Sequence, residues 1–514
     1  MARCLLFVLI VIVSLNSQLN AKPAGPNVIV IMADDLGYGD VSCYGATELQ
    51  TPNIDQLAKE GMRFTSGYCS ASTCTPTRYT FLTGKYGFRQ KGVGIAPPSA
   101  PAIIQPNTTT IASILRDAGY ATAVVGKWHL GLGPQETGPD WNGDIKPGPL
   151  EIGFDYSFLL PTTNDRVPSV YVLNHRVLNL DPKDPLWVGR KRPGPDHPTG
   201  TDPKTRAKLK MDWSHGHNST VHNGIGRIGF FSGGHAARWR DEDLADQWLE
   251  RSNEWIENHV KQKNEKPFFL FFASHDCHVP RMPHERFHGK TKLGFRGDAI
   301  VQLDWCVGEL IKTLKRLKLD NNTLVVFCSD NGPVLDDGYK DGAKEKLGKH
   351  KPAGPYRGGK YSIFEGGTRT PFITWLPGTI KPGVSDEIVT TTDLPACAAA
   401  LTGQSLKGNE CPDSFNVLDA LLGKPGAKGR DHVISQDNRG GNLGYRHGDW
   451  KLLSFQNAKP MKRLTFEKKA GKYQLYNLAS DPGERKNLFD KEPERARKMI
   501  TELEKIRAAN RTRP

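Results

Sequence analysis

Five continuous apolar runs, rich in β-branched and aromatic residues, are spaced along the chain and separated by segments with helical patterns. Runs of this length and composition are typical of strands buried on both faces. Such strands need helices on both sides, so the pattern predicts an α/β domain with a mostly parallel or mixed central sheet. The runs are Val28–Met32, Ala121–Val125, Phe268–Ala273, Leu324–Phe327 and Phe372–Trp375.

Three segments between these runs carry helix signals. Pro52 stands in a first-turn position behind Thr51 and opens a helix over Asn53–Glu60. The segment Thr110–Ala118 stops at Gly119, a usual C-terminal residue. A third helix is indicated by apolar residues at helical spacing, namely Leu303, Val307, Leu310, Ile311, Leu314 and Leu317.

Polar side chains follow four of the predicted strands at their C-terminal ends. They are Asp34, Lys127, His278 and Asp330. Open α/β sheets build their binding sites at this edge. We therefore expect these four residues to converge on one cleft.

With 514 residues the chain is too long for one simple core, which favours a large domain plus a smaller one. After about Asn409 the pattern changes to shorter segments. Residues 449–453 and 473–478 resemble paired strands around a polar stretch, 457–472, and a basic helix with Met499, Leu503 and Ile506 ends the chain. We assign residues 22–408 to the large domain and 409–514 to a small α+β domain.

Residues 1–21 have the layout of a secretory signal peptide. Arg3 precedes the apolar run Leu5–Val13, and Ala21 is a suitable cleavage site. The run is too short to span a bilayer comfortably, and no other stretch is long enough for a membrane helix. We expect an exported protein, periplasmic or secreted, without a membrane span.

The formal net charge of +14 would favour anionic substrates of an exported enzyme. A solvated surface without any partner preference explains the charge equally well. No nucleic-acid motif is present, and nucleic acid is not expected as a partner.

Residues 181–235, called the insertion below, are rich in Pro, Gly, Lys, Arg and His and show little periodicity. A segment of this kind is either a lip over the cleft that helps to select substrate or an ordinary surface insertion. Irregular spacing argues against a metal site formed by its histidines, His197, His215, His217, His222 and His235.

The most distinctive motif is Cys74-Thr75-Pro76-Thr77-Arg78, with Leu82-Thr83-Gly84 behind it. It is accompanied by Asp34-Asp35, Gly126-Lys127-Trp128-His129 and Ser329-Asp330-Asn331-Gly332. The set resembles the formylglycine sulfatases of the alkaline-phosphatase superfamily, and the likeness runs from Asn27 to about Leu488. In that family a formylglycine-generating enzyme oxidises the C-x-P-x-R cysteine to formylglycine, which becomes the nucleophile. The resemblance implies an alkaline-phosphatase-like fold and a sulfuric ester hydrolase of arylsulfatase type.

Hard oxygen ligands are supplied by Asp34, Asp35, Asp330 and Asn331. Such a set suits Ca²⁺ or Mg²⁺ and does not suit zinc. Singly, the aspartate pair is explained as well by a strand-end cap, and Asp-Asn-Gly by a turn. Their common place at strand ends favours a metal, and the resemblance points to one Ca²⁺ ion with modified Cys74 as a further ligand.

Cleavage of a sulfate ester needs positive charge on the sulfate oxygens. A cation together with Arg78, Lys127 and Lys360 would provide it. Lys360 lies in the block Gly358-Gly359-Lys360 to Pro371, which resembles a further sulfatase block, although alone it would be explained by a glycine-rich loop with a solvated lysine.

Two histidines can transfer protons near neutral pH, His129 and His278. His278 is favoured over His275 because the active-site histidine of the family also precedes one residue and a proline. The resemblance implies that Cys74, as the hydrated aldehyde, attacks sulfur with help from the metal and Asp330 while His278 protonates the leaving alcohol. His129 then takes a proton from the second hydroxyl, and sulfate is expelled.

Substrate contacts are expected from Lys127, His278 and Lys360. By the same resemblance Thr163 would touch the sulfate, and Asn164 to Arg166 would face the substrate, although loop structure explains them equally well. The substrate is expected to be a sulfated polysaccharide or its oligosaccharides. Two alternatives stay open: a phosphatase or phosphodiesterase of the same fold with two zinc ions, and a non-catalytic protein that binds sulfated glycans.

Seven cysteines remain once Cys4 and Cys74 are set aside, so at least one thiol is free or pairs with another chain. Cys306 and Cys328 are interpreted as core residues. Cys397 and Cys411 are a candidate disulfide.

Overall fold

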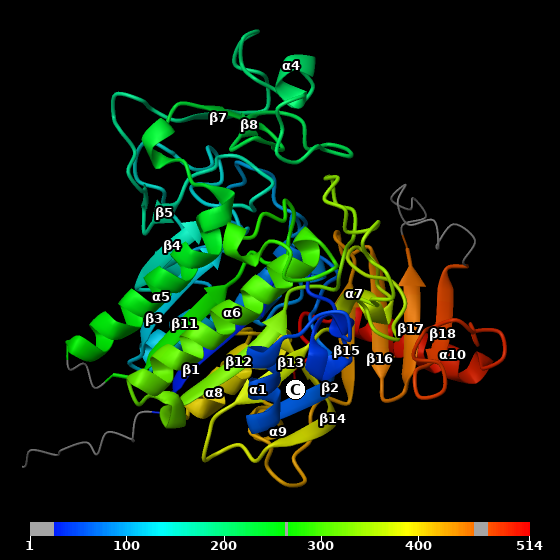
Figure 1. Ribbon diagram of the computed structural model, residues 1–514. Coiled ribbons are helices and arrows are strands. Elements are labelled where there is room, and N and C mark those ends of the chain that lie inside the picture. Colours follow the sequence, from blue (N-terminus) through cyan, green and yellow to red (C-terminus); the bar gives the residue numbers. More distant parts are fainter. Residues whose placement is uncertain (1–24, 263–265, 457–470, 514) are drawn as a thin grey trace, which may run out of the picture.

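A ten-stranded sheet lies at the centre of the large domain in the computed structural model, which describes residues 25–262, 266–456 and 471–513 (Figure 1). Its strands are β1 (Asn27–Ala33), β2 (Met62–Tyr68), β3 (Ala121–Lys127), β4 (Tyr156–Leu160), β5 (Val172–Leu173), β6 (Arg176–Val177), β11 (Phe268–Ala273), β12 (Thr323–Ser329), β13 (Phe372–Trp375) and β14 (Gly383–Thr390). Their spatial order is β14–β2–β13–β12–β1–β11–β3–β4–β5–β6.

The five strands β12, β1, β11, β3 and β4 are neighbours and run parallel. Strand β13 lies between β12 and β2 and is antiparallel to both. The sheet is therefore mixed, as predicted. All five strands expected from apolar runs are present. Every residue of β1, β11 and β12 is buried, because helices cover both faces of the sheet.

Alternate side chains of β1 enter two separate cores. Val28 and Val30 pack with α2 (Cys74–Thr83), α3 (Ile111–Asp117), α8 (Leu394–Leu401) and α9 (Leu418–Leu421). Ile29 and Ile31 pack with α1 (Pro52–Glu60), α5 (Leu244–Lys261) and α6 (Phe295–Arg316). Figure 1 shows α5 and α6 lying across one face of the sheet.

The three predicted helices correspond to α1, α3 and α6. Thr110 caps α3 by accepting a hydrogen bond from the backbone N–H of Ser113 at 3.1 Å. Asp304 of α6 caps the start of α1, where it accepts from the N–H groups of Asn53 (3.0 Å) and Ile54 (2.8 Å). A carboxylate at a helix N-terminus satisfies donors that the helix itself leaves unpaired.

The insertion contains only short elements: β7 (Trp187–Gly189), α4 (Pro203–Arg206), β8 (Val221–His222), β9 (Ile225–Gly226) and β10 (Phe230–Ser232). Strand β7 pairs with β10 and β8 with β9, so two small two-stranded sheets form outside the central sheet. In Figure 1 these elements stand beyond the ends of β4 and β5.

In the described part of the small C-terminal domain, a four-stranded antiparallel sheet packs with helix α10 (Pro493–Ala508), in agreement with the predicted α+β class. The strands are β15 (His432–Gln436), β16 (Asn442–His447), β17 (Trp450–Phe455) and β18 (Tyr473–Asn477). Met499 and Leu503 of α10 are buried against Leu452 and Leu475 of the sheet. The predicted pair of strands, β17 and β18, is antiparallel, and most of the polar stretch between them lies outside the described residues.

The predicted Cys397–Cys411 disulfide is wrong, since all cysteines of the described residues are free. The thiol of Cys397 lies 3.9 Å from the backbone oxygen of Phe415, whereas Cys411 packs beside Gly84 at the end of α2. The expected signal peptide, residues 1–21, lies outside the described residues. Among the helices that the structure describes, none combines the length and the apolar character needed to cross a membrane.

Candidate active site

Neighbouring parallel strands deliver polar side chains to one edge of the sheet. Each group follows or ends its strand: Asp330 and Asn331 after β12, Asp34 and Asp35 after β1, His278 after β11, Lys127 and His129 at β3, and Thr163 after β4. All of these side chains are buried. Asp34, Lys127, His278 and Asp330, expected to converge from the strand ends, therefore lie together at this edge.

Cys74 is the first residue of α2, whose ten residues are all buried. Its Sγ lies 3.1 Å from Nδ1 of His129. Burial raises the pKa of the Cys74 thiol, which keeps it protonated. The thiol is therefore the hydrogen-bond donor, and Nδ1 of His129 is the acceptor.

The other ring nitrogen of His129 fixes its tautomer. Nε2 lies 3.1 Å from the backbone oxygen of Ala96, an atom that can only accept, so Nε2 carries the proton. Burial, together with Arg166 and Lys127, holds the pKa of His129 well below its usual range. His129 is therefore neutral, and its unprotonated Nδ1 faces Cys74.

Arg78 and Lys127 bring positive charge to the aspartates. Arg78 stands one turn after Cys74 on α2, and its Nε donates to Oδ2 of Asp330 at 3.0 Å. Its Nη1 donates to the backbone oxygen of Lys127 at 2.9 Å. The ammonium of Lys127 forms an ion pair with Asp34.

Lys360 reaches the same cluster from the glycine-rich segment. Its Nζ lies 2.9 Å from Oδ2 of Asp35 and 2.8 Å from Oδ2 of Asp337. Burial opposes the charged form, but the two carboxylates hold the pKa of Lys360 well above its usual range. Gly359 is needed beside it, because a Cβ there would collide with the backbone oxygen of Pro333.

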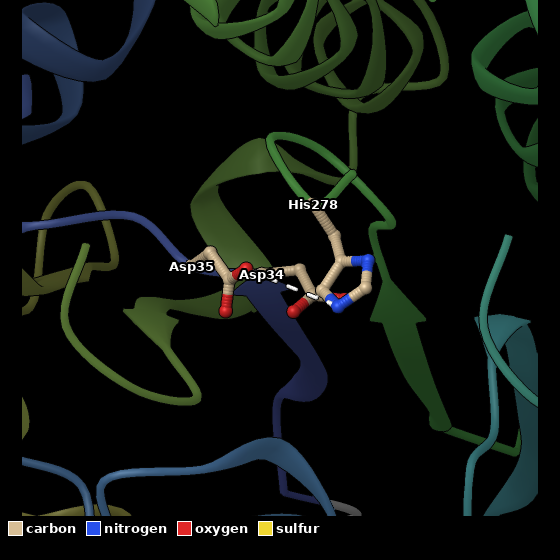
Figure 2. A group of neighbouring side chains, drawn as sticks. All are labelled: Asp34, Asp35 and His278. Atoms are coloured by element: carbon tan, nitrogen blue, oxygen red, sulfur yellow. Dashed lines mark ion pairs between the residues drawn. The ribbon is translucent and has the colours of Figure 1, made fainter. Parts of the chain in front are cut away.

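Donor atoms for a cation gather at Asp34, Asp35 and His278, within 4.8 Å of one another (Figure 2). Asn331 joins them, with its Nδ2 donating to Oδ1 of Asp35 at 2.7 Å. Among the described residues, Oδ1 of Asp34 and Oδ1 of Asn331 are buried without a hydrogen-bond partner. Burial and the charge of Asp330 raise the pKa of Asp34 to about 8. Buried, unpaired carboxylate and amide oxygens fit a hard cation such as Ca²⁺ or Mg²⁺.

His278 lies closer to this cluster than His275 does. Its Nδ1 donates to the backbone oxygen of Val279 at 2.6 Å, which leaves Nε2 facing Asp35 at 3.9 Å. Burial, with Lys360 and Lys127 nearby, holds the pKa of His278 well below its usual range. Nδ1 of His275 instead accepts from the indole N–H of Trp248 at 3.0 Å, away from the aspartates.

The segment after β4 borders His278. Asn164 places Oδ1 3.3 Å from Nδ1 of His278 and donates to the backbone oxygen of Pro280. The hydroxyl of Thr163 donates to Asp165, and Nη1 of Arg166 lies 2.9 Å from Oδ1 of the same aspartate. The structure thus brings Thr163 and Arg166 together at Asp165 and places Asn164 against His278.

The family model named Sulfatase matches residues 26–404. The chain belongs to the sulfatase family. This sulfatase is 47% identical to an N-acetylgalactosamine-6-O-sulfatase of Bacteroides thetaiotaomicron, over 96% of this chain and 94% of the relative. It is 31% identical to human arylsulfatase A, over 91% of this chain and 84% of the relative.

Solved structures agree with this family assignment. A Bacteroides thetaiotaomicron protein, solved in work on the metabolism of multiple glycosaminoglycans, superposes with a TM-score of 0.90 at 46% identity, covering 95% of this sulfatase and all of that chain. A sulfatase from Pseudoalteromonas sp. superposes with a TM-score of 0.68 at 26% identity, covering 95% and 92% of the two chains. The alkaline-phosphatase-like fold and the activity of a sulfuric ester hydrolase are thereby confirmed, in place of the phosphatase and the non-catalytic alternatives.

Sequence reasoning missed two residues of this sulfatase that contact the site. Asp337 binds Lys360 and, at 2.9 Å, the hydroxyl of Tyr361. His217, from the insertion, places Nε2 3.0 Å from Oδ2 of Asp165. Neither residue belongs to a block with regular spacing, so no pattern in the sequence marks it. A cavity of about 750 Å³ opens beside Lys360, and its lining includes His215, Asp336, Lys344, Arg357 and Phe364.

Proposed function

We propose that this sulfatase removes the 6-O-sulfate of N-acetylgalactosamine in a sulfated carbohydrate, with a formylglycine made from Cys74 as nucleophile and one Ca²⁺ ion in the site. The substrate is supported by 47% identity, along nearly the whole chain, to a relative named for this reaction. The nucleophile is supported by one geometric observation above the others: the 3.1 Å contact between Cys74 and a neutral His129.

The ion would be held by Asp34, Asp35, Asp330 and Asn331, together with modified residue 74. When bound, it would supply positive charge for the sulfate oxygens and for the attacking oxygen. The ammonium of Lys127 and of Lys360 and the guanidinium of Arg78 already point at the carboxylates of this cluster. These fixed charges are suited to stabilise a transition state whose negative charge grows on sulfate.

Hydrated formylglycine supplies two hydroxyl groups on one carbon, so that one can attack sulfur and the other can later drive sulfate out. Nδ1 of His129 lies where it can take the proton of that second hydroxyl. Nε2 of His278, which lies 3.9 Å from Oδ2 of Asp35, is suited to protonate the leaving alcohol. A bound sulfate adds negative charge there, which raises the pKa of His278 toward the acid form.

Binding of the substrate is assigned to Lys127, His278 and Lys360, with Thr163, Asn164 and Arg166 at the sugar side.

We further propose that residues 1–21 direct export to the periplasm or the medium. The catalytic domain would then span residues 22–408 and the small domain 409–514. Because Cys74 is only 2% exposed, a formylglycine-generating enzyme must reach it before the chain folds.

The test is hydrolysis of an aryl sulfate and of N-acetylgalactosamine 6-sulfate by protein co-expressed with a formylglycine-generating enzyme. The matching aryl phosphate is the control substrate, and Cys74→Ala is the control variant. We expect sulfate release that needs both Cys74 and Ca²⁺. Sulfate or phosphate release that survives in Cys74→Ala would overturn the proposed nucleophile.

A further inference from the structure

The insertion carries more positive charge than its ion pairs neutralise. Its 55 residues include nine Lys or Arg against five Asp and no Glu, a net charge of +4. Some of these charges are internal, since Arg192 pairs with Asp202 at 3.0 Å and Arg206 with Asp212 at 2.8 Å. Five exposed cations of the insertion make no ion pair with any described residue: Lys183, Arg190, Lys191, Lys204 and Lys208.

Four of these cations, Arg190, Lys191, Lys204 and Lys208, come from two segments that are joined to each other. Arg192 directly follows Lys191, and its guanidinium binds Asp202, the residue before α4. Lys204 lies in α4, and Lys208 follows it. The ion pair of Arg192 therefore holds the exposed Arg190-Lys191 pair near the two lysines.

An aromatic ring lies beside this charge. Trp187, on β7, is one of two large apolar side chains that are exposed among the described residues, at 43%. Its ring extends over Gly189, where an added Cβ would lie only 2.5 Å from Cζ2. Gly189 thus leaves room for the indole to lie along the strand that leads to Arg190. An exposed aromatic face next to cations suits a sugar ring that carries anionic groups.

The other side of the insertion is fixed to the active site. Besides the contact of His217 with Asp165, Ser214 donates to Oδ1 of Asp336 at 2.9 Å, and His215 lines the cavity beside Lys360. Arg227 is fully buried and binds both Asp241 and the backbone oxygen of Asn164. These contacts therefore hold the insertion against the active site.

We propose that Trp187 with Arg190, Lys191, Lys204 and Lys208 forms a binding platform for a sulfated glycan chain, outside the site where the sulfate is removed. This inference rests on the proposed function, because a sulfated sugar as substrate is what makes its own polyanionic chain the natural occupant. The platform holds sugars of the chain that are not being desulfated, and it raises the local concentration of chain ends at the site.

The platform is tested by binding of chondroitin 6-sulfate to full-length protein with an unmodified Cys74 thiol, which needs no catalysis. The double variant Arg190→Ser/Lys191→Ser removes two platform charges. The matched control is Arg497→Ser/Lys498→Ser, which removes two exposed charges from α10 in the small domain. We expect the platform variant to weaken binding about tenfold at low salt, with a smaller loss at high salt, and the control to stay within about twofold.

Trp187→Ala should weaken binding by a factor that salt does not change, because stacking does not depend on ionic strength.

Equal affinity of the platform variant and its control would overturn the inference. So would equally tight binding of unsulfated hyaluronan or of single-stranded DNA to the wild-type protein. Sulfate release from monosaccharide N-acetylgalactosamine 6-sulfate should be unchanged in the matured platform variants. Failure of that reaction in the wild-type enzyme would instead count against the proposed function.

Discussion

Nζ of Lys360 lies 2.9 Å from Oδ2 of Asp35, and this contact joins residues 325 positions apart in the chain. It fixes the glycine-rich segment to the end of β1, the central strand of the site. Because Asp35 is also a proposed metal ligand, the same carboxylate orients a cationic side chain and a cation. Because Lys360 also binds Asp337, a change at Asp35 and a change at Lys360 can test the two roles separately.

Asp35→Asn should remove the rise in Tm that Ca²⁺ causes, without lowering the Tm of the metal-free protein. Burial raises the pKa of Asp35, so its charge is costly in the absence of a cation. Asn also tolerates the φ of +57° at this position, and Lys360 keeps Asp337 as a partner. We expect the metal-free variant to have a Tm equal to or above that of the metal-free wild type, measured by thermal unfolding. A Ca²⁺-induced rise in Tm as large as that of the wild type would contradict the assignment of Asp35 as a ligand.

Lys360→Met should lower kcat for an aryl sulfate about 10²- to 10³-fold, as loss of one preorganised charge in a buried site does. Lys349→Met serves as the control, because Lys349 is an exposed lysine near the same segment. Similar kcat values in the two variants would exclude Lys360 from catalysis.

His129→Asn should slow the release of sulfate more than the release of alcohol. The first product does not need the base at Nδ1, whereas expulsion of sulfate does. We expect a burst of about one equivalent of phenol from an aryl sulfate, followed by turnover reduced about 10²- to 10⁴-fold. His447→Asn, at a half-exposed position in the small domain, should behave as the wild type. Slow turnover without a burst would place His129 in the first step instead.

Two buried carboxylates share one lysine where the small domain meets the glycine-rich segment. Nζ of Lys451 lies 2.8 Å from Oε1 of Glu365 and 3.3 Å from Oε1 of Glu484. Burial raises the pKa of Glu484 from 4.5 to about 7. Although burial also acts on Glu365, Lys451 and Arg369 lower its pKa to about 2. One carboxylate therefore stays ionised while the other holds a proton in mildly acidic solution.

Glu484→Gln should flatten the dependence of stability on pH. Because the folded-state pKa of Glu484 exceeds its unfolded value, its contribution to stability is complete below pH 4.5 and is lost as the pH rises through 7. Gln has no proton to lose, so the variant should gain about 2 kcal/mol of unfolding free energy relative to wild type between pH 5 and pH 8. Thermal unfolding at both pH values measures this, with the exposed Glu494→Gln as control. If the unfolding free energy of the wild type and of Glu484→Gln depended on pH in the same way, the raised pKa of Glu484 would be refuted.

The central strands and most of the site could be predicted because their signals are local. A strand buried on both faces is a continuous apolar run, as in Phe268–Ala273, and the residue after it must stand at the edge of the sheet. Knowledge of the strand order was not needed to expect convergence at the edge. The order β12–β1–β11–β3–β4 then places the expected side chains next to one another.

Contacts between distant loops could not be predicted in the same way. His217 belongs to an insertion without periodicity, and only the folded chain places it against Asp165. The disulfide expected between Cys397 and Cys411 failed for a related reason. Closeness in sequence does not determine the direction of two side chains, and these two thiols pack against different neighbours.

The most direct measurement of the proposed nucleophile uses Cys74→Ser, which replaces the modified residue with a plain alcohol. Its hydroxyl can attack sulfur, but a sulfated serine has no second hydroxyl to expel sulfate. Incubation with an aryl sulfate should release one equivalent of phenol and then stop, and mass spectrometry should find one SO₃ group on the peptide that contains residue 74. Continued turnover, or a single turnover with that peptide unmodified, would contradict attack on sulfur by residue 74.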